Sequence, residues 1–467
     1  MANYRKLGKN VLIMTIGSFG SRVISFVFVP FYTAVLTTAE YGVTDLITTT
    51  ATLLLPLFTL TVFESMMRFP LDQKHDPAQV WQVGCRVEAV GLLAFLVLSP
   101  LVLLTILREY YGFVVAYYVA MSVNRCVSYY VRGVNKVTVY AVAGTLHTLF
   151  IVLLSLLFLL VVKIGIVGYL LAHVIASLLS TGYMFLAAKL YRLPLRGAAN
   201  RQLRGEMLRY SIPLIPNSVC WWIANVSDRY ILTAFADTSA TGVYSVAYKI
   251  PTVISALTSI FGNAWKLSAV EDFGSEKSRE FFSDVFSKLA ALMVLAASFL
   301  LVVNKPLARV LFQKDFYAAW QFVPILLLAS VMHAYAEFFG SIYTSSYRTR
   351  FLVISTAVGS GVNILLNFLL IPRYQGFGAA VATLIGYAVI WLARVVHSRR
   401  ILVLRYHVVR DALCYALVIG QAFIACRSYP HEYLLSGAIF VLLLALMHRE
   451  LLGLARMLGR RFLRRKG

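Results

Sequence analysis

Residues 225–250 have the sequence NVSDRYILTAFADTSATGVYSVAYKI, two apolar segments joined by a short polar turn. Three charged residues lie within the apolar segments, namely Asp228, Arg229 and Lys249. One other stretch has the same form: residues 34–43, AVLTTAEYGV, align with residues 234–243, AFADTSATGV, 200 positions further on. Each stretch is predicted to end one helix, turn, and open the next with Gly-Val. The pattern indicates one structural unit present twice, with the second copy beginning near Asp228.

The composition is that of an integral membrane protein. Of the 467 residues, 60% are apolar and 13% are charged, and the mean hydropathy is +0.77. Soluble proteins carry about 25% charged residues. The five cysteines are scattered, their spacing does not match a metal site, and their odd number predicts no disulfide framework. We therefore expect a membrane fold without a bound metal or cofactor.

The apolar residues are grouped into segments long enough to cross a bilayer. A transmembrane helix needs roughly 20 such residues, and the pattern predicts an all-α membrane protein with about 14 transmembrane helices. The polar region 304–318 is predicted to contain a short surface helix. The predicted spans are 10–36, 41–66, 79–106, 110–131, 137–162, 165–188, 210–236, 240–265, 282–304, 318–345, 350–371, 376–397, 408–427 and 432–453.

Lysine and arginine are unevenly distributed between the two sides of these spans. With the N-terminus inside, 30 of them, Arg394 included, fall in or beside the inside connections and 7 in the outside ones. The positive-inside rule then places both termini in the cytoplasm. The net charge of +23 is therefore an orientation signal beside anionic lipid, and no nucleic-acid partner is expected.

The long connection 189–209 divides six predicted helices from six. Residues 1–188 are expected to form an N-terminal lobe, 189–209 a cytoplasmic linker, 210–400 a C-terminal lobe, and 401–467 two further helices with a basic cytoplasmic tail. A second internal match supports the repeat, because Gly168 and Ala172 correspond to Gly378 and Ala382. Six spans per copy give both copies the same orientation. A parallel pseudo-two-fold axis along the membrane normal is expected, with a cavity between the lobes.

Basic residues within the spans are candidate ligand contacts, because an ionisable side chain in mid-membrane is costly unless it faces protein or water. Arg22 lies about twelve residues into the first span, in a serine-rich stretch that could otherwise serve close helix packing. Arg125 shares one polar face with tyrosine and serine residues. Arg229 and Lys249 are the corresponding candidates of the second copy, with Lys249 predicted to lie inside the eighth helix.

Acidic residues within the spans are candidates for ion coupling. Asp228 and Glu337 are the two that we single out for coupling to H⁺ or Na⁺, and the alternative is a structural pair with a basic residue on another helix. Glu88 is interpreted as structural or as lying near an interface, and Asn363 and Asn367 as forming interhelical hydrogen bonds. A phosphate-binding loop and a His-Glu-x-x-His motif are absent from the sequence, and the connections are too short to hold a catalytic domain. The chain is therefore not expected to be an enzyme.

Three groups of residues resemble the polysaccharide transporter family, which includes the Wzx-type lipid-linked oligosaccharide flippases. The resemblance covers about residues 5–400. The superfamily, MOP, also contains the MATE drug exporters and the lipid II flippases, so a MATE-like arrangement is implied. The matching residues are Lys9-Asn10, Pro30, Glu40-Tyr41-Gly42-Val43 and Arg68; Asp228-Arg229-Tyr230 with Gly242 to Lys249; and Asn363, Asn367, Ile371-Pro372, Gly376 and Gly378-Ala379-Ala380.

The resemblance implies a flippase of the bacterial inner membrane, active in the biosynthesis of polysaccharides such as O-antigen. Its substrate would be an undecaprenyl-pyrophosphate-linked oligosaccharide, carried from the cytoplasmic to the outer leaflet by alternating access. It also implies contact with membrane lipids and an association with the polysaccharide polymerase machinery. Arg229 and Lys249 belong to a matched motif, whereas Arg22 and Arg125 are carried over only by helix.

Three other functions compete with this one. An ion-coupled drug exporter of the same fold would favour an acidic cavity for cationic drugs. In this chain, the ionisable residues near the middle of the spans are mainly basic. A lipid II flippase is a narrower variant of the same activity. A membrane polymerase or ligase acting on the same lipid carrier would need a large external loop, and the longest predicted outside connection is only about residues 304–318.

Overall fold

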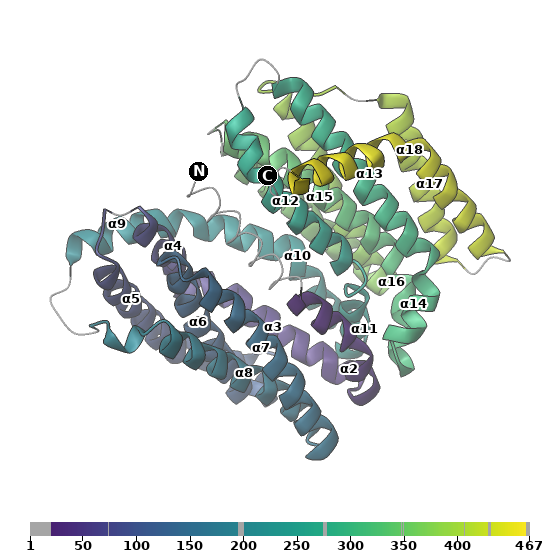
Figure 1. Cartoon of the computed structure of the whole chain (residues 1–467). Coiled ribbons are helices and arrows are strands. Elements are labelled where there is room, and N and C mark those ends of the chain that lie inside the picture. The colour runs from purple at the N-terminus through teal and green to yellow at the C-terminus, as the bar shows by residue number, and fades with distance from the viewer. Residues whose placement is uncertain are drawn as a thin grey trace. The chain divides into compact units, whose positions relative to one another are not determined.

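The computed structural model describes residues 20–463, with gaps at residues 73, 195–199, 274–277, 347, 349, 406 and 428–430. The described residues form helices joined by short turns, without a β-strand, which confirms the all-α fold (Figure 1). They divide into two compact units, one ending at Trp222 and the other beginning at Ile223. This boundary falls within helix α10 (Ile215–Phe235). The division into lobes and linker given above stays a prediction.

The first unit is a bundle of apolar helices with a core at one end. Met66, Val83, Val127 and Met207 are buried together there, from four different helices. The helices of this unit are α2 (Val29–Val35), α3 (Thr38–Phe58), α4 (Val62–Leu71), α5 (Pro77–Leu98), α6 (Tyr111–Gly133), α7 (Val137–Leu156), α8 (Gly165–Ala187) and α9 (Arg201–Ser211), before α10 begins.

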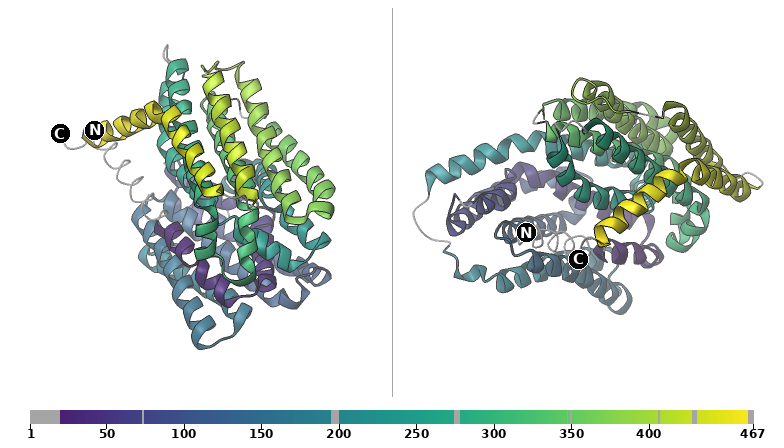
Figure 2. Two further views of the ribbon diagram at one scale, coloured as in Figure 1. Left: turned by 90° about the vertical axis from the view of Figure 1, so that its right-hand side faces the viewer. Right: turned by 45° about the horizontal axis from the view of Figure 1, so that its top comes forward.

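The second unit contains the remaining helices, of which α15 and the long α16 are packed against each other (Figure 2). After α10 its α-helices are α11 (Thr238–Ala247), α12 (Thr252–Asp272), α13 (Ser278–Val302), α14 (Asn304–Leu311), α15 (Val323–Ser345), α16 (Arg350–Ser398), α17 (Val408–Cys426) and α18 (Glu432–Leu463). Helix α14 and the 3-10 helix η6 (Lys314–Gln321) confirm a short helix in the region 304–318.

Nine helices in the described part of the chain are long and apolar enough to cross a membrane, or ten if the bent pair α11–α12 is one span. The chain is therefore a multi-pass membrane protein, but the expected number of 14 spans is not confirmed. Helices α6 and α10 have 23 and 21 residues, yet polar side chains lower their hydropathy. Helix α16 counts once, although Gln375 breaks it between the two predicted spans 350–371 and 376–397. Part of the first predicted span lies outside the described residues.

The structure interrupts two other predicted spans. Span 41–66 breaks after α3, where Leu60 and Thr61 adopt left-handed backbone conformations and a new helix, α4, begins. Span 240–265 bends by 47° between α11 and α12. Pro251 lies at this bend and has no N–H to continue the helical hydrogen bonds, which accounts for the interruption.

The two stretches that match at an offset of 200 residues have the same local structure. Thr37 is the N-cap of α3, where its hydroxyl accepts a hydrogen bond from the Glu40 N–H at 3.2 Å. The Glu40 carboxylate in turn accepts from the Thr37 N–H at 2.8 Å, which completes a capping box. Asp237 is the N-cap of α11 and accepts from the Ala240 N–H at 2.6 Å. The predicted turns of both copies are confirmed.

The second internal match, Gly168 with Gly378, marks two close approaches of chain segments. A Cβ atom on Gly168 would lie 2.7 Å from the Cβ of Phe158, and one on Gly378 would lie 2.6 Å from the backbone of Leu370. In both units a helix therefore begins against the end of the helix before it. These contacts need a residue without a side chain.

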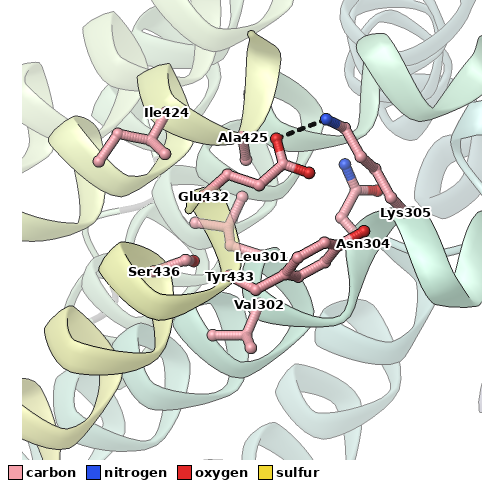
Figure 3. Close-up of a pocket in the computed structure, with 9 residues that line it drawn as sticks. All are labelled: Leu301, Val302, Asn304, Lys305, Ile424, Ala425, Glu432, Tyr433 and Ser436. Atoms are coloured by element: carbon pink, nitrogen blue, oxygen red, sulfur yellow. Dashed lines mark hydrogen bonds and ion pairs between the residues drawn. The ribbon is translucent and has the colours of Figure 1, made fainter. Parts of the chain in front are cut away.

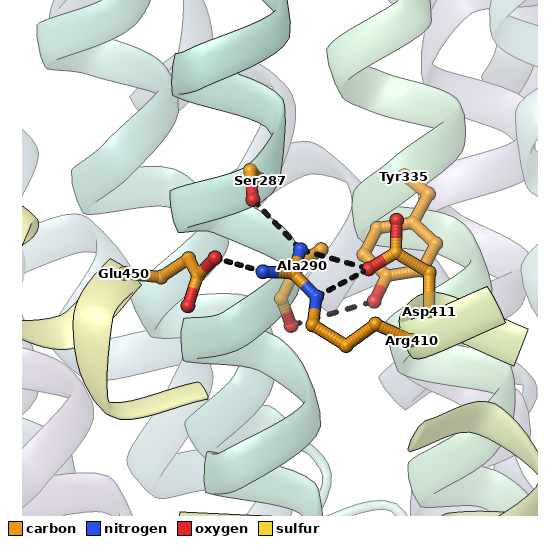
Figure 4. Close-up of polar contacts among 6 residues, drawn as sticks. All are labelled: Ser287, Ala290, Tyr335, Arg410, Asp411 and Glu450. Atoms are coloured by element: carbon orange, nitrogen blue, oxygen red, sulfur yellow. Dashed lines mark hydrogen bonds and ion pairs between the residues drawn. The ribbon is translucent and has the colours of Figure 1, made fainter. Parts of the chain in front are cut away.

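Helices α17 and α18 are joined to α13 and α14 by polar contacts at three levels. At one end Arg410 lies between Glu450 and Asp411 and donates to Ser287 at 3.1 Å (Figure 4). In the middle, the Gln421 amide bonds Ser298 and Ser436.

At the other end of the pair the Lys305 ammonium reaches the Glu432 carboxylate at 2.5 Å, beside a cavity of about 20 Å³ (Figure 3). Such a cavity has room for about one water molecule. The three levels make α17 and α18 an integral part of the second unit.

Candidate functional site

A cavity of about 280 Å³ lies in the first unit between α6, α7 and α8. Its volume is close to the lower end of the roughly 300–1,000 Å³ typical of small-molecule sites. Arg125, a predicted ligand contact, is one of the residues that line it. The full lining is Tyr117, Met121, Asn124, Arg125, Ser128, Tyr140, Ala143, Gly144, His147, Ser177, Ser180 and Met184.

The polar groups of this cavity are held in place by hydrogen bonds between its helices. The Asn124 amide of α6 donates to the Thr181 hydroxyl at 2.9 Å and to the Ser177 carbonyl at 3.2 Å. The His147 ring of α7 bonds the Ser177 hydroxyl at 3.2 Å. The Arg125 guanidinium lies 5.7 Å from the centre of the Tyr129 ring. The cavity thus combines a cation with hydroxyl, amide and imidazole groups.

Arg22 lies outside the lining of this cavity. It belongs to the helical segment that is described from Gly20, and its side chain is exposed. Its neighbour Ser21 donates to the carbonyl of Gly144, a lining residue, at 3.3 Å. The segment that carries Arg22 therefore contacts α7 beside the cavity, without contributing the arginine to it.

The second polar centre surrounds Asp228 in the second unit. Its carboxylate is buried, and one oxygen, Oδ2, accepts hydrogen bonds from Tyr244 at 2.7 Å, Tyr248 at 3.0 Å and Thr383 at 3.3 Å. The other oxygen, Oδ1, accepts from the Arg229 N–H at 2.9 Å. Four donors from three helical segments therefore meet one acid.

Arg229 and Asp228 point in different directions, as their adjacent positions on one helix predict. The Arg229 guanidinium lies 4.9 Å from the centre of the Tyr248 ring, and the hydroxyl of that same ring donates to Asp228. A cation over an aromatic face is stabilised by the ring quadrupole. Tyr248 therefore links the acid to the base.

An amide network extends the Asp228 centre into α16. The Ser227 hydroxyl donates to Asn363 Oδ1 at 3.2 Å, and the Asn367 amide donates to the same oxygen at 3.1 Å. The Asn363 amide reaches the Thr383 hydroxyl at 3.5 Å. The predicted interhelical hydrogen bond of Asn363 is confirmed, whereas Asn367 bonds within its own helix.

The sequence predicts Lys249 inside a helix, but the structure places it in the turn between α11 and α12. It is half-buried, and its carbonyl accepts from the Thr252 hydroxyl at 2.5 Å. The prediction was wrong because it took span 240–265 as one straight helix, whereas Pro251 interrupts it.

Glu337 on α15 is half-buried and lies within electrostatic reach of Arg394 and His333. The His333 ring is 5.0 Å from that of Tyr387, whose hydroxyl donates to Asn225 at 2.6 Å. The two acids proposed for ion coupling thus belong to one unit.

Arg394 was wrongly counted among the residues beside a connection, because its side chain is fully buried. Its guanidinium donates to the Ala336 carbonyl at 2.7 Å, to Ser355 at 3.0 Å and to Thr356 at 2.9 Å. Its place near the end of an apolar run looks like that of a surface anchor. Its partners are 38 to 58 residues away in sequence and could not be recognised there.

Comparison with known proteins identifies related sequences and folds. A family described as polysaccharide biosynthesis protein matches residues 7–265, more than half of the chain. A search of curated protein sequences found no match.

Several solved membrane transporters have a similar fold. The lipid II flippase MurJ in an inward closed conformation is 13% identical, with a TM-score of 0.71 over 94% of this chain and 100% of its own. An inward-facing MATE multidrug transporter of the MOP superfamily is 13% identical, with a TM-score of 0.62 over 85% of this chain and 96% of its own. A mutant of the Vibrio cholerae MATE transporter VcmN is 13% identical, with a TM-score of 0.55 over 85% of this chain and 97% of its own. At such identities the likeness concerns the fold.

Proposed function

The chain belongs to the polysaccharide biosynthesis protein family, and from this premise we propose that it is a flippase for an undecaprenyl-pyrophosphate-linked oligosaccharide. Family members and structural neighbours are transporters and flippases rather than enzymes. The proposed activity carries the glycan from the cytoplasmic to the outer leaflet of the inner membrane by alternating access. Both termini then lie in the cytoplasm, and the polysaccharide polymerase machinery receives the product.

The Arg125 cavity is the observation that carries this proposal. A guanidinium in a site of low dielectric attracts the negative pyrophosphate strongly and can bond two of its oxygens. Tyr117 and Tyr140 offer aromatic faces for sugar rings, and Asn124 and Ser177 offer hydrogen-bonding groups. About 280 Å³ cannot hold a whole lipid-linked oligosaccharide. The cavity therefore takes one part of the substrate, a phosphate group or a single sugar.

The remaining cationic residues are proposed as further contacts for negative groups of the substrate, each within its own unit. Arg22 lies beside the cavity helix of the first unit, and Arg229 and Lys249 belong to the second unit. The turn position of Lys249 suits this role, because a broken helix leaves its last turn free to adjust.

Asp228 is the proposed coupling site for H⁺ or Na⁺. It is a buried acid in a network of oxygen groups that includes Tyr248, Thr383 and Asn363. Hard cations such as Na⁺ prefer oxygen ligands. Glu337, near His333 in the same unit, is the proposed second acid.

Two alternatives use the same fold. A lipid II flippase would carry a related pyrophosphate-linked substrate, so the cavity alone does not discriminate against it. A drug exporter would take mainly cationic molecules, which Arg125 would repel. The basic cavity favours the glycan flippase over the exporter.

Complementation of a bacterial strain that lacks its oligosaccharide flippase tests the proposal. We expect Arg125→Ala to reduce surface glycan at least 10-fold at normal expression, and Arg125→Lys to retain part of it, because lysine keeps the charge but loses the two-pronged geometry. Arg309→Ala, at an exposed position of α14, is the matched control. Alanine variants of Arg22, Arg229 and Lys249 are measured in parallel.

Full transport by all four alanine variants would overturn the basic-site proposal. A drug-resistance phenotype without any change in surface glycan would favour the exporter instead. Rescue of a strain that lacks its lipid II flippase, without rescue of the oligosaccharide mutant, would identify the narrower alternative.

A further inference from the structure

Glu88 is a buried acid of the first unit that the proposed transport mechanism does not use. It lies on α5, eleven residues after Pro77, and about 16 Å along the helix at 1.5 Å per residue. Its side chain is 6% exposed. The acid therefore lies well inside an apolar span, where an ionised group is costly.

Two side chains of α6 bond the Glu88 carboxyl group. The Ser122 hydroxyl contacts Oε1, and the Cys126 thiol donates to Oε2 at 3.1 Å. Both partners are buried, as is the nearby Tyr118. Among the described residues, no basic side chain forms an ion pair with Glu88.

Residues of two buried apolar clusters flank Glu88 and its partners along α5 and α6. Val87 and Val127, the sequence neighbours of Glu88 and Cys126, belong to one cluster, and Phe95 and Tyr118 belong to the other. Cys85 is the titratable neighbour on the same helix. On α4, Met66 is buried in the first of these clusters.

The remaining charged residues near this interface face elsewhere. The acid of α4, Glu64, interacts instead with Arg125 and Arg132. Arg86 lies two residues before Glu88 on α5 and therefore about 200° away around the helix, because each residue turns by about 100°.

A carboxylate without a cation in such a place costs several kcal/mol, whereas the neutral acid does not. The neutral acid also fits the partners, because its O–H can donate to the Ser122 oxygen while Oε2 accepts from Cys126. Loss of the proton would leave a charge that needs water or a cation between α5 and α6. The contact between the two helices is therefore stable in one protonation state only.

We propose that Glu88 is a proton-binding site of the first unit, whose proton keeps α5 closed against α6. The same α6 carries Arg125 on the face that lines the cavity, whereas Ser122 and Cys126 lie toward Glu88. Binding or release of this proton thus acts on the helix that holds the substrate contact. This last step, from proton to transport, rests on the proposed flippase function.

Infrared difference spectroscopy on the full-length purified protein tests the proton site without any substrate. We expect the wild type to show a protonated carboxylic acid at neutral pH that is missing in Glu88→Gln. The S–H stretching band of Cys126, assigned by its absence in Cys126→Ala, should shift when high pH removes the proton from Glu88. In Asp228→Asn the Glu88 band should remain. Absence of the acid band in the wild type at neutral pH, at unchanged fold, would overturn the proposal.

Inverted membrane vesicles test the link to transport, with a fluorescent polyprenyl-pyrophosphate-linked disaccharide as the probe. A pH gradient should stimulate the wild type, and in Glu88→Gln this stimulation should be at least 10-fold smaller, with the transport of each protein without a gradient as its own reference. Stimulation of Glu88→Gln equal to the wild type would refute the link. No transport by the wild type in either condition would instead refute the flippase function, and the infrared result would still decide the proton site.

Discussion

Asp228 and Glu88 are both buried carboxyl groups within apolar helices, one in each unit, yet their partners differ. Asp228 accepts from three hydroxyls and a backbone N–H, and Arg229 follows it in the chain. The Glu88 carboxyl group is bonded by one hydroxyl, that of Ser122, and one thiol, that of Cys126. Four charge-assisted hydrogen bonds can stabilise an ionised acid, whereas one hydroxyl and one weakly donating thiol offset much less of its desolvation. The comparison teaches that the donors around a buried acid, rather than its burial, decide whether it holds a charge or a proton.

The largest effect is expected from substitution of Asp228. In Asp228→Asn the new amide N–H₂ must replace Oδ2, because the Arg229 N–H needs an oxygen at Oδ1. Tyr244 and Tyr248 then lose charge-assisted hydrogen bonds worth about 1.5–3 kcal/mol each. We expect the free energy of unfolding to fall by about 3 kcal/mol, measured by detergent-induced unfolding of the purified protein. An Asn variant as stable as the wild type would show that Asp228 is already neutral.

The turns and helices of the fold could be read from the sequence, because they depend on neighbouring residues. The capping box of Thr37 with Glu40 spans three residues, and the apolar runs of α5 or α15 are local patterns. The breaks of predicted spans after α3 and at Lys249 were missed, because a hydropathy pattern does not register a change of direction.

The partners of the buried polar groups could not be predicted. Thr383 is 155 residues from Asp228, and Ser122 is 34 residues from Glu88. The regular spacing of polar residues along α6 did predict Arg125 as a ligand contact. The surroundings of Glu88 depend on how α5 packs against α6, and a single sequence does not contain that register.

The next largest effect is expected at a close contact between helical segments that occurs once within each unit. Gly378→Ala would place a Cβ 2.6 Å from backbone atoms of Leu370, whereas Gly168→Ala would meet the side chain of Phe158 at 2.7 Å. The Cβ of Phe158 is fixed to its backbone and cannot move away alone, so we expect each substitution to lower the free energy of unfolding by about 2 kcal/mol.

Matched controls for these glycines are available in both units. Gly361 and Gly144 lie in helices with no atom within 4 Å of a new Cβ. Alanine there should be neutral or stabilise by up to about 1 kcal/mol. A clearly smaller loss at one of the two glycines would show that its unit packs this contact less rigidly than the other.

The helix caps should give a smaller and more nearly equal effect. Thr37→Ala and Asp237→Ala each remove an N-cap, and we expect each to lower the free energy of unfolding by about 1 kcal/mol. Thr37→Ala should cost more, because it also releases Glu40 from the capping box. Thr37→Ser and Asp237→Asn keep the acceptor and serve as controls, both expected within a few tenths of a kcal/mol of the wild type.

The smallest effect on stability is expected at Glu88, and it is the sharpest test of the contrast with Asp228. In Glu88→Gln the amide N–H₂ donates to the Ser122 oxygen and the amide oxygen accepts from Cys126, the same pattern as the neutral acid. Because no charge and no hydrogen bond are lost, the free energy of unfolding should change by less than about 1 kcal/mol, measured under the same conditions as Asp228→Asn. Glu88→Ala is the comparison variant, since it leaves Ser122 and Cys126 without a partner and opens a cavity that should cost about 3 kcal/mol. A loss in Glu88→Gln as large as in Asp228→Asn would mean that Glu88 carries a charge, and the two units would then hold their acids in the same state.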